Sequence, residues 1–277
     1  MSKYKRNDPC YCGSGEKYKN CHFKQDQEEE KARRQLYMAG QFLRQDLLKF
    51  ARDDRFTTPL KEALAFYWDG HYTHENADEM SQPEALRFFD WFVFDHRWQD
   101  ESGETQRLGD IYLAENGEGL TSYQRAMLSL WLDANPSWAY ELTGYEGQEL
   151  QLKDVVSGEE FEVYEGAGHG EAEPGDLILA RLVPVGERLE FSTNAAYLPK
   201  AEVGDLPDTL KAAREADPDS DYAAFMQQHG HLAIHHGLAA AALQGRPPVA
   251  RMNPDRDDQR TVKAMQTTRR MYRRQSR

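Results

Sequence analysis

The sequence predicts an α+β protein that begins with a small cysteine-rich module and continues as a mainly helical domain and a small antiparallel β-barrel. Three observations support this. All three cysteines fall within the first 21 residues, apolar residues recur at helical spacing up to about residue 136, and short β-rich runs follow. C-terminal helices and a basic tail complete the expected order. The expected domains are 1–24, 25–136, 137–199, 200–245 and 246–277.

Helical periodicity and start signals define the expected helical domain. Leu36 and Leu47 lie on one face of a helix expected from residue 25 to about residue 53. Pro59 suits the first turn of a second helix. Ser81 and Thr121 each stand three residues before a Glu or Gln, which is the capping-box pattern, so we expect a buried helix after each of them.

The pattern changes to strands after residue 136. The candidate strands are 139–143, 150–153, 160–164, 177–184 and 188–192. Short strands at this density favour a small antiparallel barrel or rolled sheet of the SH3-like or OB-like kind. From Pro207 the helical pattern returns, with Asp219 or Ser220 as the expected cap of a segment that ends near Gly245.

The formal net charge of -13 hides basic ends. Residues 1–25 sum to +4 and residues 246–277 to +7, so the part between them carries -24. Such a basic tail has three possible roles: contact with RNA, a solubilising tail, or docking on the acidic middle of the chain itself. The residues expected to contact nucleic acid are Arg269, Arg270, Tyr272, Arg273 and Arg274.

Composition also indicates where the protein works. No apolar run approaches the roughly 20 residues of a membrane span, and the start of the chain lacks the apolar stretch of a signal peptide. We therefore expect a cytoplasmic protein. Three cysteines, an odd number gathered in one place, favour a metal site over a disulfide framework.

The cysteine cluster is the most specific signal in the chain. Cys10, Cys12, Cys21 and His22 supply three thiolates and one imidazole, a complete tetrahedral set for one Zn²⁺ ion. Glycines just after the first cysteine pair allow the tight turn that brings both sulfurs to one ion. Because all four positions are protein ligands, we expect a structural zinc ion without an open position for catalysis.

Residues 6–22 read RNDPCYCGSGEKYKNCH and resemble the SEC-C zinc motif, known from the C-terminal tail of the SecA translocation ATPase. The resemblance implies zinc at the same four ligands and a role in protein recognition, with a SecB-like chaperone or the ribosome as partner. Tyr11 and Glu16 depart from the common pattern, which weakens the positive face. The positions that match the partner-binding residues are Arg6, Asn7, Lys17, Tyr18 and Lys19.

A looser similarity extends further along the chain. Residues 88–95, 152–163 and 174–181 resemble a region of other bacterial SEC-C proteins. This similarity supports the order of domains and implies no activity.

The remaining motifs do not indicate a second metal site, a phosphate-binding loop or a catalytic site. His231 and His235 have the i, i+4 spacing of zinc hydrolases, but Leu232 stands where the general base belongs. His71, His74 and Glu75 lie in an expected loop without an obvious fourth ligand. Glycines at residues 166–170 indicate a hairpin loop, because a Gly-Lys-Ser/Thr ending is absent. The scattered acids Asp90, Asp95, Asp100 and Glu101 match no known catalytic pattern.

The sequence favours a non-enzymatic adaptor that recognises a protein or ribosomal partner through the zinc module. The alternative is an RNA- or DNA-binding protein that uses the barrel and the basic arm. A hydrolase with a site in the acidic middle is the third hypothesis. The candidate nucleic-acid surface of the barrel is Trp138, Phe161, Tyr164, Arg181 and Arg188.

Overall fold

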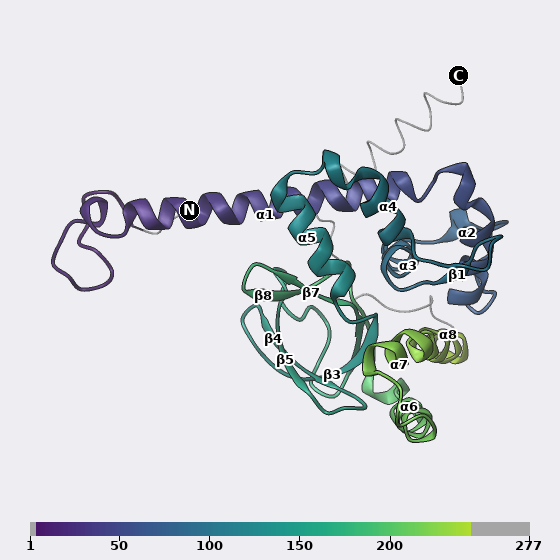
Figure 1. The fold of residues 1–277 in the computed structure, drawn as a ribbon. Coiled ribbons are helices and arrows are strands. Elements are labelled where there is room, and N and C mark those ends of the chain that lie inside the picture. Colours follow the sequence, from purple (N-terminus) through teal and green to yellow (C-terminus); the bar gives the residue numbers. More distant parts are fainter. Residues whose placement is uncertain (1–3, 245–277) are drawn as a thin grey trace.

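The computed structural model describes residues 4–244, and it shows an α+β chain built around one long helix (Figure 1). That helix, α1 (Phe23–Phe50), joins an N-terminal loop module to the body. The body contains the helices α2–α5, a curled β-sheet and the helices α6–α8. The basic segment 246–277 lies outside the described residues.

The first helical region follows the expected start signals and contains one helix more than the periodicity predicts. Both capping boxes are confirmed, because the Ser81 and Thr121 side chains accept the amides of Glu84 and Gln124, whose side chains accept the cap amides in return. The added helix, α4, follows Arg107, whose side chain makes no cap. The helices are α2 (Thr57–Tyr67), α3 (Gln82–Phe94), α4 (Leu108–Asn116) and α5 (Ser122–Asp133), and the short hairpin is β1 (Trp98–Gln99) with β2 (Thr105–Gln106).

The main sheet has seven strands in the order β7-β8-β5-β4-β3-β6-β9. It is mixed, because β5 and β8 run parallel while the other neighbours are antiparallel. The expectation of an antiparallel barrel is therefore wrong in its strand directions, whereas the expected rolled sheet agrees with the curl of these strands. The strands are β3 (Trp138–Glu146), β4 (Glu149–Asp154), β5 (Glu160–Tyr164), β6 (Leu177–Ala180), β7 (Leu182–Val185), β8 (Arg188–Phe191) and β9 (Ala196–Leu198).

One bent segment explains why the sheet curls. β6 and β7 are consecutive in the chain and are separated by Arg181 alone, yet β6 pairs with β3 while β7 pairs with β8. The segment 177–185 therefore bridges two distant parts of the strand order. The sheet is a curled half-barrel, drawn in teal and green in Figure 1.

The C-terminal helices lie beside the sheet and close the described structure. They are α6 (Leu206–Ala216), α7 (Tyr222–His229) and α8 (His231–Gln244). Asp221 is the N-cap of α7 and accepts the Ala224 amide, one or two residues later than the expected cap. No helix between residues 4 and 244 is long and apolar enough to cross a membrane.

Helices and sheet share one core. A continuous cluster of buried side chains runs from Ala39 in α1 to Ile234 in α8 and includes Trp131, Trp138 and Tyr140. Burying such large rings dominates the stabilisation of a domain of this kind. Helices and sheet therefore stabilise each other through common contacts.

A buried ion pair ties the sheet to the helices. The Arg181 Nε donates to Asp95 Oδ1 over 3.2 Å, and both side chains are almost fully buried. Arg181 Nη2 also donates to the Trp131 carbonyl, and Asp95 Oδ2 accepts the Ser137 amide. Because a buried charge is tolerated only when it is paired and hydrogen-bonded, these contacts fix the bend at Arg181.

Candidate metal centre

The four expected ligands converge at the end of the N-terminal module. The sulfurs of Cys10, Cys12 and Cys21 and a ring nitrogen of His22 all lie within 4.8 Å of one another. The Cys12 and Cys21 sulfurs are 3.5 Å apart, and His22 Nδ1 lies 3.2 Å from the Cys10 sulfur. Within residues 4–244, no other group of three or more such side chains has this geometry.

These distances and donors fit one zinc ion. A tetrahedral ion with Zn–S bonds of about 2.3 Å separates its ligand atoms by about 3.8 Å, close to the spacing seen here. Three thiolates and one imidazole are also the donor set that zinc prefers. With four protein ligands the ion would be structural, holding the loop and the start of α1 together.

The loop backbone brings the ligands together through a short antiparallel ladder. The Cys10 amide donates to the Glu16 carbonyl over 2.8 Å, and Pro9 and Lys17 form an isolated bridge. Gly13 and Gly15 have φ angles of 76° and 77°, a conformation that other residues rarely adopt. The glycines therefore allow the turn that places Cys12 beside Cys21.

Hydrogen bonds prepare one sulfur for metal binding. The hydroxyl and amide of Ser14 lower the pKa of the Cys12 thiol to about 6, because they stabilise the thiolate. The thiolate is the form that binds a metal. Cys12 is therefore largely deprotonated at neutral pH even before an ion arrives.

A tyrosine cluster supports the ligands from the side of α1. The Tyr11 and Tyr18 hydroxyls donate to the two oxygens of Asp26, over 3.0 and 2.6 Å. The Tyr11 ring also lies 4.8 Å from the His22 ring. Asp26 belongs to the first turn of α1, so these contacts join the module to the helix. The sequence gives no spacing rule for such contacts, and we did not expect Asp26 or Tyr11 to take part.

The expected partner-binding residues have unequal exposure. Arg6, Asn7, Lys17 and Lys19 are exposed, and the Lys19 amide donates to the Arg6 carbonyl, which holds these two basic residues together. Tyr18, by contrast, is 1% exposed and cannot itself touch a partner. The exposed rings of the module are those of Tyr4 and Tyr11, whose centroids are 5.5 Å apart.

The histidines near the C-terminal helices make structural contacts. His235 Nε2 donates to the Phe66 carbonyl over 2.9 Å, and His236 Nε2 donates to that of Glu202 over 2.8 Å. The rings of His231 and His235 pack against Phe66. The i, i+4 pair therefore bridges α8 to α2.

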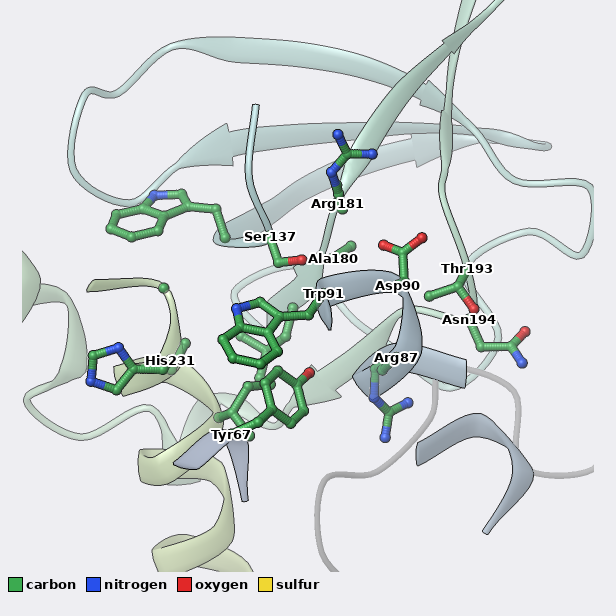
Figure 2. Close-up of a pocket in the computed structure, with 15 residues that line it drawn as sticks. Tyr67, Arg87, Asp90, Trp91, Ser137, Ala180, Arg181, Thr193, Asn194 and His231 are labelled. Carbon is green, nitrogen blue, oxygen red and sulfur yellow. The ribbon is translucent and has the colours of Figure 1, made fainter. Parts of the chain in front are cut away.

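A cavity of about 30 Å³ lies where α3, the sheet and α8 meet, and it has room for about two water molecules. Figure 2 shows that the end groups of Arg181, Arg87 and His231 point in different directions. Catalytic groups need to converge on one reacting atom. The cavity thus gives no support to the hydrolase hypothesis.

Three acids of the hydrolase hypothesis already have hydrogen-bond partners within the chain. Asp95 pairs with Arg181, Asp90 accepts the Ser192 hydroxyl, and Asp100 accepts the Ser102 hydroxyl within its own turn. The expected nucleic-acid surface of the sheet is also incomplete. Trp138 and Arg181 are each only 2% exposed, so these two side chains cannot contact a nucleic acid.

Comparisons with known proteins agree with the metal centre. Residues 6–24 match the SEC-C motif. The chain is 26% identical over 223 residues to the "Uncharacterized protein YccF" of Bacillus subtilis (strain 168). The matched region covers 78% of this chain and 58% of that relative. No solved structure matches the chain. Residues 6–24 are therefore a SEC-C motif, and its Cys10, Cys12, Cys21 and His22 form a cluster with the geometry to hold one metal ion.

Proposed function

We propose that this protein is a zinc-stabilised, non-enzymatic adaptor whose SEC-C motif recognises a protein or ribosomal partner. The position of the motif carries the proposal. Figure 1 shows the module at the far end of α1, with the first half of that helix projecting from the body. A motif held away from the body is accessible to a large partner.

The projecting half of α1 is suited to act as a rigid spacer. Nearly all of its side chains from Lys24 to Gln35 are polar or charged and are in contact with solvent. The pairs Lys24–Glu28 and Glu30–Arg34 are four residues apart and within 4.0 Å, as in helices that are stable without tertiary contacts. Twelve residues extend over about 18 Å at 1.5 Å per residue, which sets the distance of the module from the body.

The exposed surface of the module is basic and aromatic. It carries Arg6, Lys17 and Lys19 together with the rings of Tyr4 and Tyr11. Tyr18 would support this surface from beneath, through its hydroxyl contact with Asp26. Such a surface suits an acidic protein segment or ribosomal RNA, and the resemblance to the SecA motif favours a SecB-like chaperone or the ribosome.

Ribosome co-sedimentation over a salt series tests the proposal. The Lys17→Glu/Lys19→Glu variant reverses two exposed charges without touching the metal ligands, and we expect it to reduce pelleting at least about tenfold. The control variant Lys61→Glu/Lys211→Glu makes the same charge change at exposed positions on α2 and α6 and should pellet like the unaltered chain.

A Cys10→Ser/Cys12→Ser variant separates the motif from the rest of the chain in the same assay, and it should not pellet. Pelleting by all variants would show that the motif is not the ribosome-binding element. If the unaltered chain does not pellet, binding to a SecB-like chaperone is measured with the same variants, and its absence as well would overturn the proposal.

Nucleic-acid binding by the sheet has less support, because most of the exposed charges on β3–β5 are negative. Contact by Arg269, Arg270, Tyr272, Arg273 and Arg274 stays a prediction, since these residues lie outside the described part of the chain. In the sedimentation assay this alternative would appear as pelleting that survives loss of the cysteines and falls steeply with salt.

A further inference from the structure

The exposed face of the sheet contains a groove that the metal centre does not use. Its volume is about 340 Å³, and it crosses β3, β4 and β5 on the outer side of the curl. The lining residues are Thr143, Gln151, Leu152, Glu160, Phe161 and Glu162.

A bulge in β3 helps to make the groove. The register of β3 on β4 shifts between Leu142 and Gly144, so that Gly144 stands opposite Gln151. A Cβ atom at residue 144 would lie 2.7 Å from Gln151 Oε1. The missing Cβ of Gly144 therefore makes room for the Gln151 side chain, which lines the groove.

The groove concentrates negative charge. Glu160 and Glu162 are both exposed and point to the same face, since they are two residues apart on one strand. Residues 139–176 contain eleven Asp and Glu residues and a single basic residue, Lys153, which stands opposite Glu160 and Glu141. Among residues 4–244, no ion pair involves Glu141, Glu160 or Glu162.

We propose that the basic segment 246–277 of this same chain docks in the groove. That segment carries ten Lys and Arg residues against three Asp residues, the opposite of the sheet face. Glu160 and Glu162, about 7 Å apart on one face of a strand, offer two negative charges to the long basic side chains of such a segment. Charge complementarity of this kind selects a basic peptide and disfavours nucleic acid.

The covalent connection favours this occupant over a separate partner. The described chain ends with α8 at Gln244, and 30 or more residues can span roughly 100 Å when extended, so any face of the body is within reach. A tethered segment has an effective concentration of up to about millimolar, which makes weak charge contacts sufficient for docking. The inference does not depend on the partner of the zinc module.

Docking has a functional consequence. While the basic segment lies on the sheet, its arginines are not available to an anionic partner. Such a partner would have to compete with the groove, so an anion that binds the segment should release it.

Limited trypsin digestion of the full chain tests the proposal. Docking protects the arginines of residues 246–277, so the unaltered chain should lose the segment slowly in low salt. Cleavage should become about threefold faster or more near 0.5 M NaCl, where the Debye length falls to about 4 Å. A synthetic peptide of residues 246–277 corrects for the effect of salt on trypsin.

Two matched variants assign the docking site. Glu160→Gln/Glu162→Gln should speed cleavage in low salt about threefold or more, because two carboxylates of the groove are lost. Glu28→Gln/Glu29→Gln removes the same charge from the exposed side of α1 and should leave the rate unchanged. Equal rates for all three proteins would overturn the proposal, and a rate that depends on protein concentration would show that a second copy supplies the segment.

Carbodiimide cross-linking provides a measurement that needs no variant. Lys263 is the only lysine of the segment, so it can form a zero-length amide with a carboxylate that it touches. Docking predicts cross-links from Lys263 to Glu160 or Glu162 in the unaltered chain, and their loss in high salt. Cross-links from Lys263 only to carboxylates outside residues 139–176 would contradict the proposed site.

Discussion

Asp90 shows how a single half-buried acid links pH to stability. Its carboxylate accepts the Ser192 hydroxyl, and burial raises its pKa to about 6 even though Arg181 and Ser192 act in the opposite direction. In the unfolded chain the same group loses its proton near pH 4. Between about pH 4 and pH 6 the folded protein therefore holds a proton that the unfolded chain has lost, so stability falls as the pH rises through this range.

We expect Asp90→Asn to remove this pH dependence. An amide does not titrate, and its oxygen can still accept the Ser192 hydroxyl. The free energy of unfolding of the variant, relative to that of the unaltered chain, should rise by about 1–3 kcal/mol between pH 4 and pH 7. Urea unfolding over a pH series measures this difference, with the exposed Asp219→Asn as control. Parallel curves for the Asp90 variant and the unaltered chain would show that Asp90 does not titrate differently on folding.

The ligand residues could be predicted from sequence, whereas the residues that support them could not. Cys10, Cys12, Cys21 and His22 have a fixed spacing that reflects the geometry of one ion. Asp26 acts through two tyrosine hydroxyls, and any acid at several nearby positions would look the same in the sequence. The bond between Asp95 and Arg181 joins residues 86 positions apart, which no local pattern reveals.

At the scale of elements, the junction of α7 and α8 is set by one glycine. A Cβ atom on Gly230 would lie 2.5 Å from the Ser137 carbonyl oxygen and 2.9 Å from that of Met226. Both neighbours are backbone atoms, which cannot move aside as a flexible side chain can. Gly230 therefore allows the helices to lie directly against the start of β3.

Gly230→Ala should destabilise the protein by about 2–3 kcal/mol through this overlap. Gly119→Ala is the matched control, because a Cβ atom there would meet nothing within 4 Å. Its effect should stay within about 0.5 kcal/mol, as for other surface changes. Thermal and urea unfolding compare the two variants. If Gly230→Ala is as stable as the control, the close packing of α7 and α8 on β3 is refuted.

Elements with strong local signals were predictable, and those that depend on distant partners were not. The two capping boxes begin α3 and α5 where the sequence places them. α4 was not expected, because Arg107 provides no cap and the helix has only nine residues. The parallel pairing of β5 with β8 is decided by how the sheet curls, which strand propensity does not encode.

At the scale of the whole molecule, the metal module and the body have separate cores. Cys10 and Tyr18 are buried within the module but do not belong to the continuous core of the body, which begins at Ala39. The charged half of α1 lies between the two. Loss of the metal should therefore affect the module and leave the body intact.

We expect the Cys10→Ser/Cys12→Ser variant to lose its metal and the hydrogen-exchange protection of residues 4–22. A small module without its ion lacks the contacts to remain folded. Protection of β3–β5 should stay unchanged, and the free energy of unfolding of the body in urea should change by less than about 0.5 kcal/mol. Hydrogen exchange with mass spectrometry measures both regions in one experiment. A clear loss of protection in the sheet would mean that module and body fold as one unit.

The overall order of helices, strands and helices was predictable from periodicity, because that information is local. The predicted domain boundaries stay a prediction. The structure shows that helices and sheet share one core, in which Trp131 of α5 and Trp138 of β3 lie together. Contacts of this kind form only when distant segments meet, so the sequence pattern alone does not show them.

Because α1 is one uninterrupted helix from the metal centre into the core, its length fixes both the distance and the orientation of the module relative to the body. Each residue of a helix adds about 1.5 Å and turns the chain by about 100°. An insertion of seven residues in the projecting half would carry the module about 10 Å further out while turning it by only about 20°. An insertion of five residues would turn it by about 140° and aim its basic surface at another side. The number of residues between His22 and the first buried turn of α1 thus determines the direction in which the motif faces its partner.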